Sequence, residues 1–144
     1  MSFYLRFISE DKLPSVPELV ERWSGLETLR FSEVDASSAT IEDDSGVIAA
    51  IEVNRPGDGL FEEELSEMRD DAESADGDKS DVFRVLDAAQ STLAFEVLMS
   101  ADGLEASVSK LGPLFEWVPQ NFKGLIHADG EGFYRGRDLV LDVG

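Results

Sequence analysis

The chain has no cysteine and a single histidine, His127, among its 144 residues. Without cysteine there can be no disulfide, no thiolate metal site and no thiol nucleophile. Any imidazole base, Ser-His-Asp arrangement or histidine metal site must use His127. The lack of cysteine fits a reducing compartment, so we expect a cytoplasmic protein.

Positive charge is scarce, because 12 basic residues stand against 31 acidic ones and the formal net charge is −19. A protein that binds nucleic acid or an anionic membrane needs clustered Lys and Arg to neutralise phosphate groups. The balance therefore predicts neither nucleic acid nor membrane as a partner, and a charged partner should be cationic. A solubilising surface suited to a salty or acidic environment is the alternative explanation of the same charge.

Long hydrophobic runs are absent as well. No apolar stretch approaches the roughly 18 to 20 residues needed to span a bilayer. The first residues, 1–6, lack a basic stretch followed by an apolar run and a cleavage site, which predicts no secretory signal. Because 42% of the residues are hydrophobic, we expect a soluble chain with a substantial core.

The first half of the chain predicts one strand, one helix and three further strands. Apolar residues alternate with others from Phe3 to Ile8, which is typical of a strand. Ser15 and Glu18 form a capping-box pattern in front of an apolar helical face. Turn residues then separate three segments of high strand propensity. The predicted elements are a strand at 3–8, a helix ending at 23, and strands at 28–34, 39–42 and 47–54.

The second half repeats this order. Apolar residues follow helical spacing from Leu104 to Val118, but Gly112 and Pro113 interrupt the helix, so we expect a kink or a stop followed by a second helix. Strands are predicted at 92–99, 124–128, 132–135 and 138–143. Since both halves read as strand, helix and three strands, we hypothesise an internal duplication.

Residues 59–90 join the two halves and are predicted to form two helices separated by a loop. The first helix has one narrow apolar face and the second starts at Ser80. The sequence thus predicts an α+β protein with a single compact domain, 1–144. It would contain two similar βαβββ units, at about 1–58 and 91–144, with a largely antiparallel sheet, helices covering one face, and an acidic helical connector at about 59–90.

The acidity is densest in this connector, where residues 60–81 contain ten acidic and two basic side chains, a net charge of −8. We therefore expect a non-enzymatic interaction protein, of an inhibitor, adaptor or immunity type, that binds a cationic protein surface. The expected partner-binding residues are Glu62, Glu63, Glu64, Glu67, Asp70 and Asp71.

The alternative is a small-molecule-binding domain or minor enzyme with a pocket between the two halves. Its expected ligand-binding residues are His127, Tyr134, Arg135 and Arg137. The glycines at 130–136 suit hairpin turns better than a phosphate loop, because the third glycine is displaced and no helix follows. No motif indicates a catalytic residue, a metal site or a cofactor.

Overall fold

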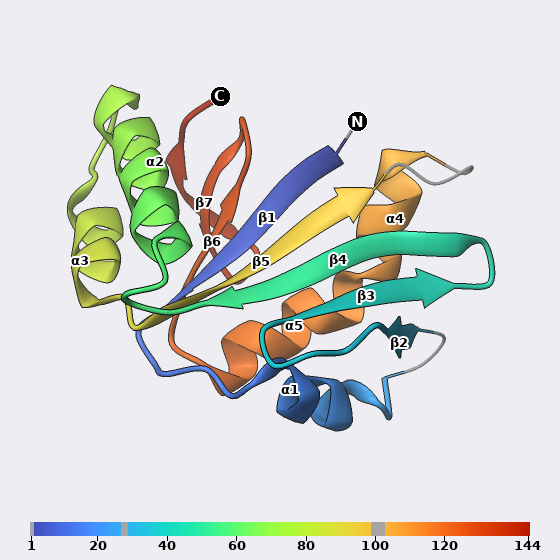
Figure 1. Ribbon diagram of the computed structural model, residues 1–144. Coiled ribbons are helices and arrows are strands. Elements are labelled where there is room, and N and C mark those ends of the chain that lie inside the picture. The colour runs from blue at the N-terminus through green and yellow to red at the C-terminus, as the bar shows by residue number, and fades with distance from the viewer. Residues whose placement is uncertain (1, 27–28, 99–102) are drawn as a thin grey trace.

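The computed structural model describes residues 2–26, 29–98 and 103–144. These residues form an α+β fold with eight strands and five helices. All eight strands belong to one sheet in the order β2-β3-β4-β5-β1-β6-β7-β8, and every neighbouring pair is antiparallel. The sheet is therefore continuous, with β1 and β5 at its centre (Figure 1).

The element boundaries agree closely with the predicted ones. The strands are β1 (Ser2–Ser9), β2 (Arg30–Ser32), β3 (Ser38–Asp43), β4 (Gly46–Asn54), β5 (Ser91–Leu98), β6 (Gly124–Ala128), β7 (Gly132–Arg135) and β8 (Asp138–Asp142). The helices are α1 (Val16–Trp23), α2 (Leu60–Ser74), α3 (Ser80–Ala88), α4 (Leu104–Lys110) and α5 (Gly112–Asn121). Thr28 and Met99, at the ends of two predicted strands, lie outside the described residues.

Two helix boundaries show how local sequence decides the fold. The helical stripe that begins at Leu104 stops at Leu111, and a new helix starts with Pro113 in its first turn, where the missing N–H of proline costs nothing. Ser15 occupies the N-cap position of α1 as predicted, but its side chain makes no capping hydrogen bond.

The helices lie on both faces of the sheet rather than on one, as Figure 1 shows. Helices α1, α4 and α5 pack on one face around a core that contains Trp23, Phe95 and Leu114. Helices α2 and α3 pack on the other face, where Met68 and Val85 contact Phe133 and the strands beside it. The segment between β4 and β5 is thus a structural layer that fills the second core, and no free connector is seen.

Two similar units are not confirmed by the sheet. The element order does repeat along the chain. However, the three strands β2 to β4 and the three strands β6 to β8 are joined to the central strands β5 and β1 through non-corresponding members. In the first half β4, the last strand of its group, pairs with β5. In the second half β6, the first strand of its group, pairs with β1. A simple two-fold repeat would place corresponding strands at corresponding positions.

The two helical layers are offset along the sheet. The α1, α4 and α5 layer covers mainly the β2 to β1 side, whereas the α2 and α3 layer covers mainly the β1 to β8 side. One half of each sheet face therefore lacks a helical cover.

Among the helices of the described residues, none has the length and the apolar character that a membrane-spanning helix requires.

Candidate functional site

Polar side chains line the sheet face on the α2 side, and strand register places them in rows. Tyr4 of β1 lies opposite Glu96 of β5. In the next row, Arg6 of β1 lies opposite Ala94 of β5, which lies opposite Glu52 of β4. Alternate residues of a strand share a face, so these rows lie on one side of β4, β5 and β1, and the other side of these strands packs in the apolar core. We call this polar surface of the three strands the polar floor.

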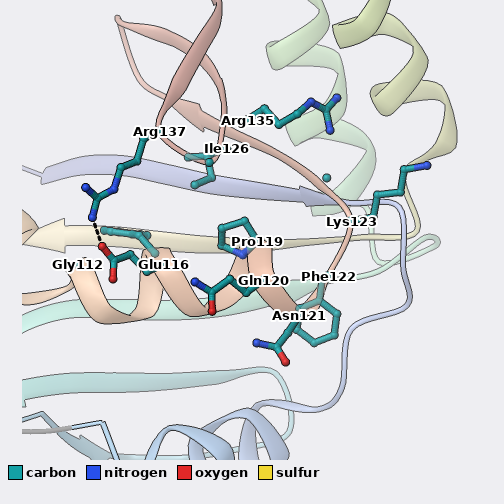
Figure 2. A pocket seen from close by; sticks show the side chains of 13 residues that line it. Gly112, Glu116, Pro119, Gln120, Asn121, Phe122, Lys123, Ile126, Arg135 and Arg137 are labelled. Atoms are coloured by element: carbon teal, nitrogen blue, oxygen red, sulfur yellow. Dashed lines mark hydrogen bonds and ion pairs between the residues drawn. The ribbon is translucent and has the colours of Figure 1, made fainter.

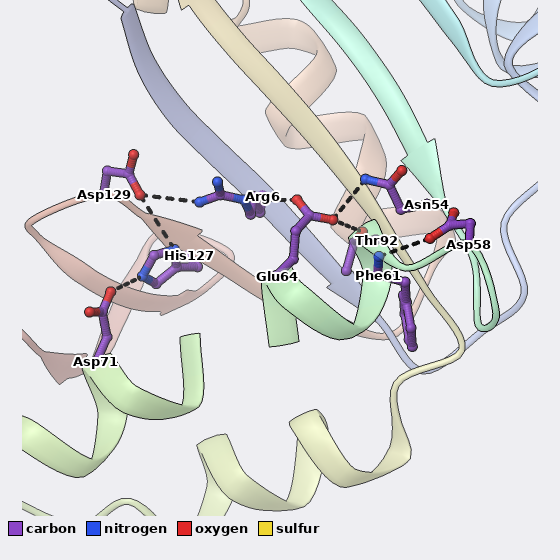
Figure 3. A network of polar contacts seen from close by, with 9 residues as sticks. All are labelled: Arg6, Asn54, Asp58, Phe61, Glu64, Asp71, Thr92, His127 and Asp129. Carbon is purple, nitrogen blue, oxygen red and sulfur yellow. Dashed lines mark hydrogen bonds and ion pairs between the residues drawn. The ribbon is translucent and has the colours of Figure 1, made fainter. Parts of the chain in front are cut away.

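Glu64 of α2 is the hub of a polar network on this floor (Figure 3). Its Oε2 accepts a hydrogen bond from Nε of Arg6 at 2.8 Å. Its Oε1 accepts from Nδ2 of Asn54 at 2.8 Å and from Oγ1 of Thr92 at 2.6 Å. The side chains of Glu64 and Arg6 are each only 11% exposed. Through its three hydrogen-bond donors, Glu64 connects α2 to the strands β4, β5 and β1.

The imidazole of His127 lies further along the same network and is 2% exposed. Its Nε2 is 2.9 Å from Oδ2 of Asp71 on α2, and its Nδ1 is 4.0 Å from Oδ1 of Asp129. Asp129 also accepts a hydrogen bond from Arg6 at 3.2 Å. Burial lowers the pKa of His127 and outweighs the two carboxylates, which raise it. The imidazole is therefore neutral near pH 7, and Nε2 carries the proton that it donates to Asp71.

This geometry does not indicate catalysis. Nδ1 of His127 has no hydrogen-bond partner, and the ring is shielded from solvent. Within residues 2–26, 29–98 and 103–144, no group of three or more His, Asp or Glu side chains could hold a metal ion. The contacts of this network connect α2 to β6 and β1 through Arg6, Asp71, His127 and Asp129.

The uncovered half of the same sheet face forms a hollow of about 330 Å³. Four carboxylates, those of Glu33, Asp35, Glu52 and Glu96, line it around the ring of Tyr4. None of the described residues that line this hollow is a lysine or an arginine. We call this surface the acidic face.

Two pKa shifts report the electrostatics of the acidic face. Burial raises the pKa of Glu52, and the negative charges of Glu64 and Asp58 raise it further. Burial also raises the pKa of Tyr4, with a smaller contribution from Glu96. Burial is the largest cause of both shifts and opposes charge of either sign. Only the smaller contribution, from the negative charges of Glu64, Asp58 and Glu96, favours a cation in the hollow.

The six predicted partner-binding residues of α2 divide into three groups. Glu62 accepts hydrogen bonds from the N–H groups of Gly57 and Gly59 and so caps the helix. Glu64 and Asp71 point to the sheet and belong to the polar network. The other three are exposed, and two of them line a second hollow of about 340 Å³ next to His127. These exposed residues are Glu63, Glu67 and Asp70.

The four predicted ligand-binding residues are not brought together. His127 faces α2, whereas Tyr134 packs on the opposite side of the sheet. Arg135 and Arg137 both border a groove of about 1000 Å³ beside α5. Figure 2 shows them pointing apart, and each forms an ion pair, Arg135 with Asp81 and Arg137 with Glu116.

Tyr4, Glu52 and Glu96 were not among the residues predicted for a site, although the sequence pattern around them indicates an uncovered sheet face. Each stands at an alternate position of a strand whose other positions are strongly apolar. A strand buried on both faces would carry apolar residues at nearly every position, so these polar positions indicate one uncovered face.

Comparison of the chain with protein-family models, with curated proteins and with solved structures finds no match.

Proposed function

We propose that this chain is a non-enzymatic cytoplasmic interaction protein that binds a cationic protein surface through its acidic face. The observation that supports the proposal best is the hollow beside Tyr4, in which Glu33, Asp35, Glu52 and Glu96 gather without a lysine or arginine among the described lining residues. An inhibitor, adaptor or immunity-type protein would use such a surface to cover a basic site on its partner.

The rest of the polar floor differs from this hollow because a basic side chain, Arg6, is paired with its carboxylate Glu64. Arg6 neutralises the charge of Glu64, and the neutral side chains of Asn54 and Thr92 donate further hydrogen bonds to it. Glu52 lies in the row next to it, has a raised pKa, and forms no ion pair with a described residue. An arginine or lysine of a partner that entered the hollow would supply the missing positive charge, and arginine could bind a carboxylate through two hydrogen bonds.

Exposed acids on α2 extend the same side of the molecule. Glu63, Glu67 and Asp70 project from the helix that borders the polar floor. Together with the net charge of −19, they would attract a basic partner over a distance and raise its association rate. The same charges repel a phosphate backbone, so nucleic acid and anionic membranes do not enter the proposal.

The first experiment is an affinity pull-down from host lysate at low and high salt, with bound proteins identified by mass spectrometry. A basic protein that is retained at low salt and released at high salt is the expected result. The double variant Glu52→Lys/Glu96→Lys should then lose at least tenfold in affinity for that protein. Its salt dependence should also become flatter, because fewer opposite charges meet in the complex.

The matched control is Glu18→Lys/Glu21→Lys on α1, which changes the net charge equally on the other side of the sheet. Both control residues are exposed. If the two double variants weaken binding to the same extent, only the net charge matters and the acidic face is not the site. If the retained molecules are small metabolites or neutral proteins, the proposed partner class is wrong.

A small-molecule function built on His127, Tyr134, Arg135 and Arg137 has no comparable support, because these side chains lie on different sides of the sheet. An evolutionary duplication of the βαβββ unit stays a proposal that rests on the repeated element order alone. The strand order of the sheet does not support it.

A further inference from the structure

A second, mainly apolar pocket of about 510 Å³ lies on the opposite side of the sheet from the acidic face. It lies between α4 and the strands β1, β6 and β7, and Phe115 of α5 contributes to its wall. Its walls come from β1, α4, α5, β6 and β7, which contribute Phe3, Leu104, Val108, Phe115, Ile126 and Tyr134. We call it the apolar pocket.

Two carboxylates border the apolar pocket. Glu105 of α4 and Glu131 of the β6–β7 turn are both exposed and both line it. No lysine or arginine occurs among its described lining residues, and neither glutamate forms an ion pair with a described residue. The hydroxyl of Tyr134 donates only a long, 3.5 Å hydrogen bond to Oε1 of Glu131. The pocket thus combines an apolar interior with a negatively charged border.

We propose that the apolar pocket binds a small organic ammonium ion with an apolar body. The volume lies within the range of small-molecule sites, and burial of an apolar chain against these walls is favourable at roughly 25 cal/mol per Å². The rings of Phe3, Phe115 and Tyr134 can contact an alkylated ammonium group through cation–π interactions. Glu105 and Glu131 supply the opposite charge.

The charge pattern selects this class of ligand over two others. A fatty acid or other anionic amphiphile would bring its carboxylate next to Glu105 and Glu131, where like charges repel. A neutral alcohol would gain the apolar contacts but would leave both glutamates without a cation. The inference does not depend on the proposed protein partner, because the apolar pocket and the acidic face share no lining residue.

The test uses octyltrimethylammonium as the probe, with octanoate and tetramethylammonium as comparisons, in about 0.15 M salt to screen long-range attraction. Titration is followed by calorimetry and by NMR of the methyl groups of Val108 and Ile126. We expect saturable binding of octyltrimethylammonium with shifts at these methyl groups, and binding at least tenfold weaker for each comparison compound. Equal binding of octanoate would overturn the proposal.

Because the whole chain is strongly acidic, the decisive comparison is between two double variants of equal net charge. Glu105→Gln/Glu131→Gln should weaken binding of octyltrimethylammonium about tenfold, in the range expected for two exposed charge pairs. Glu63→Gln/Glu67→Gln on α2 should change it less than twofold. If both variants weaken binding equally, the probe is held by net charge and the pocket is not its site.

A third variant tests the location without removing charge. Ser109→Trp places a large side chain at an exposed position of the pocket lining, where it should narrow the pocket without disturbing the core. We expect unchanged circular dichroism and at least a tenfold loss of binding. Unchanged affinity in this folded variant would place the bound probe elsewhere and overturn the proposal.

Discussion

Nε2 of His127 lies 2.9 Å from Oδ2 of Asp71, and this hydrogen bond joins strand β6 to helix α2. The imidazole is almost completely buried, whereas the side chain of the aspartate is 46% exposed. The contact therefore connects the interior of the polar network to solvent, and its strength depends on the protonation state of the ring.

The first prediction concerns stability below neutral pH. The pKa of His127 is lowered from 6.5 in the folded protein, mainly by burial. The unfolded chain therefore binds a proton at His127 before the folded chain does, and stability falls as pH drops below about 6.5. Urea denaturation at a series of pH values should show this loss, and an NMR titration of the ring should give the lowered pKa.

The control for this prediction is His127→Gln, which cannot titrate. Between pH 7 and pH 5 its stability should depend less on pH than that of the parent chain, because the proton uptake by the unfolded state at this position is removed. An unchanged pH dependence in the variant would show that His127 does not cause the loss.

The second prediction is that Glu64→Gln destabilises the protein by about 3 kcal/mol, since it leaves the largely buried Arg6 without one of its two carboxylate partners. The neighbouring Glu63→Gln should change the free energy of unfolding by less than about 0.5 kcal/mol because Glu63 is exposed. Chemical denaturation measures both values. Similar losses of unfolding free energy in the two variants would show that Glu64 is not the central residue of the polar network.

The third prediction concerns acid. Nζ of Lys110 lies 2.6 Å from Oδ2 of Asp43, and the hydroxyl of Ser45 donates to the same carboxylate. These contacts lower the pKa of Asp43 from 3.8 to about 2. The stability that they provide is present above about pH 4 and is lost as pH falls toward 2.

Asp43→Asn is the variant that tests this contribution. Acid unfolding followed by circular dichroism should show a shallower loss of stability between pH 4 and pH 2 than in the parent chain. A variant whose acid unfolding curve keeps the parent's slope would mean that Asp43 is not stabilised in this way.

The fourth prediction uses a close backbone approach. A Cβ atom added at Gly124 would lie 1.9 Å from the carbonyl oxygen of Ile8, in the paired strands β6 and β1. Since backbone cannot move aside cheaply, Gly124→Ala should cost about 3 kcal/mol or more. At Gly25, no atom of the described residues beyond its two chain neighbours lies within 4 Å of the added Cβ. The same substitution should be tolerated there, and thermal denaturation compares the two variants.

The sequence predicted the elements well because local patterns determine them. Alternation from Phe3 to Ile8 predicted β1, and the Gly112-Pro113 pair predicted the break between α4 and α5. These features depend on neighbours in the chain, such as the missing N–H of a proline. Turn glycines placed β6 and β7 at their observed boundaries for the same reason.

The arrangement of the sheet was not predictable in this way. The pairing of β4 with β5 and of β6 with β1 joins residues far apart in sequence, and local propensity carries no information on it. The role of α2 could be predicted in part from the sequence. Glu64 and Asp71 are spaced by seven residues with Met68 between them, so they border the buried stripe of the helix. Which acids of α2 bind the sheet depended on Arg6 and His127, which the sheet order brings under the helix.

The central position of β1 has a consequence for how the chain can fold. Strand β1, Ser2–Ser9, pairs with β5 and β6, and both of these partners come more than 80 residues later in the chain. The strand can pair with β5 only once residues 91–98 are present, and with β6 only once residues 124–128 are present. Closure of such long loops slows folding. A chain without residues 1–10 would lack the strand that joins the two ends of the sheet.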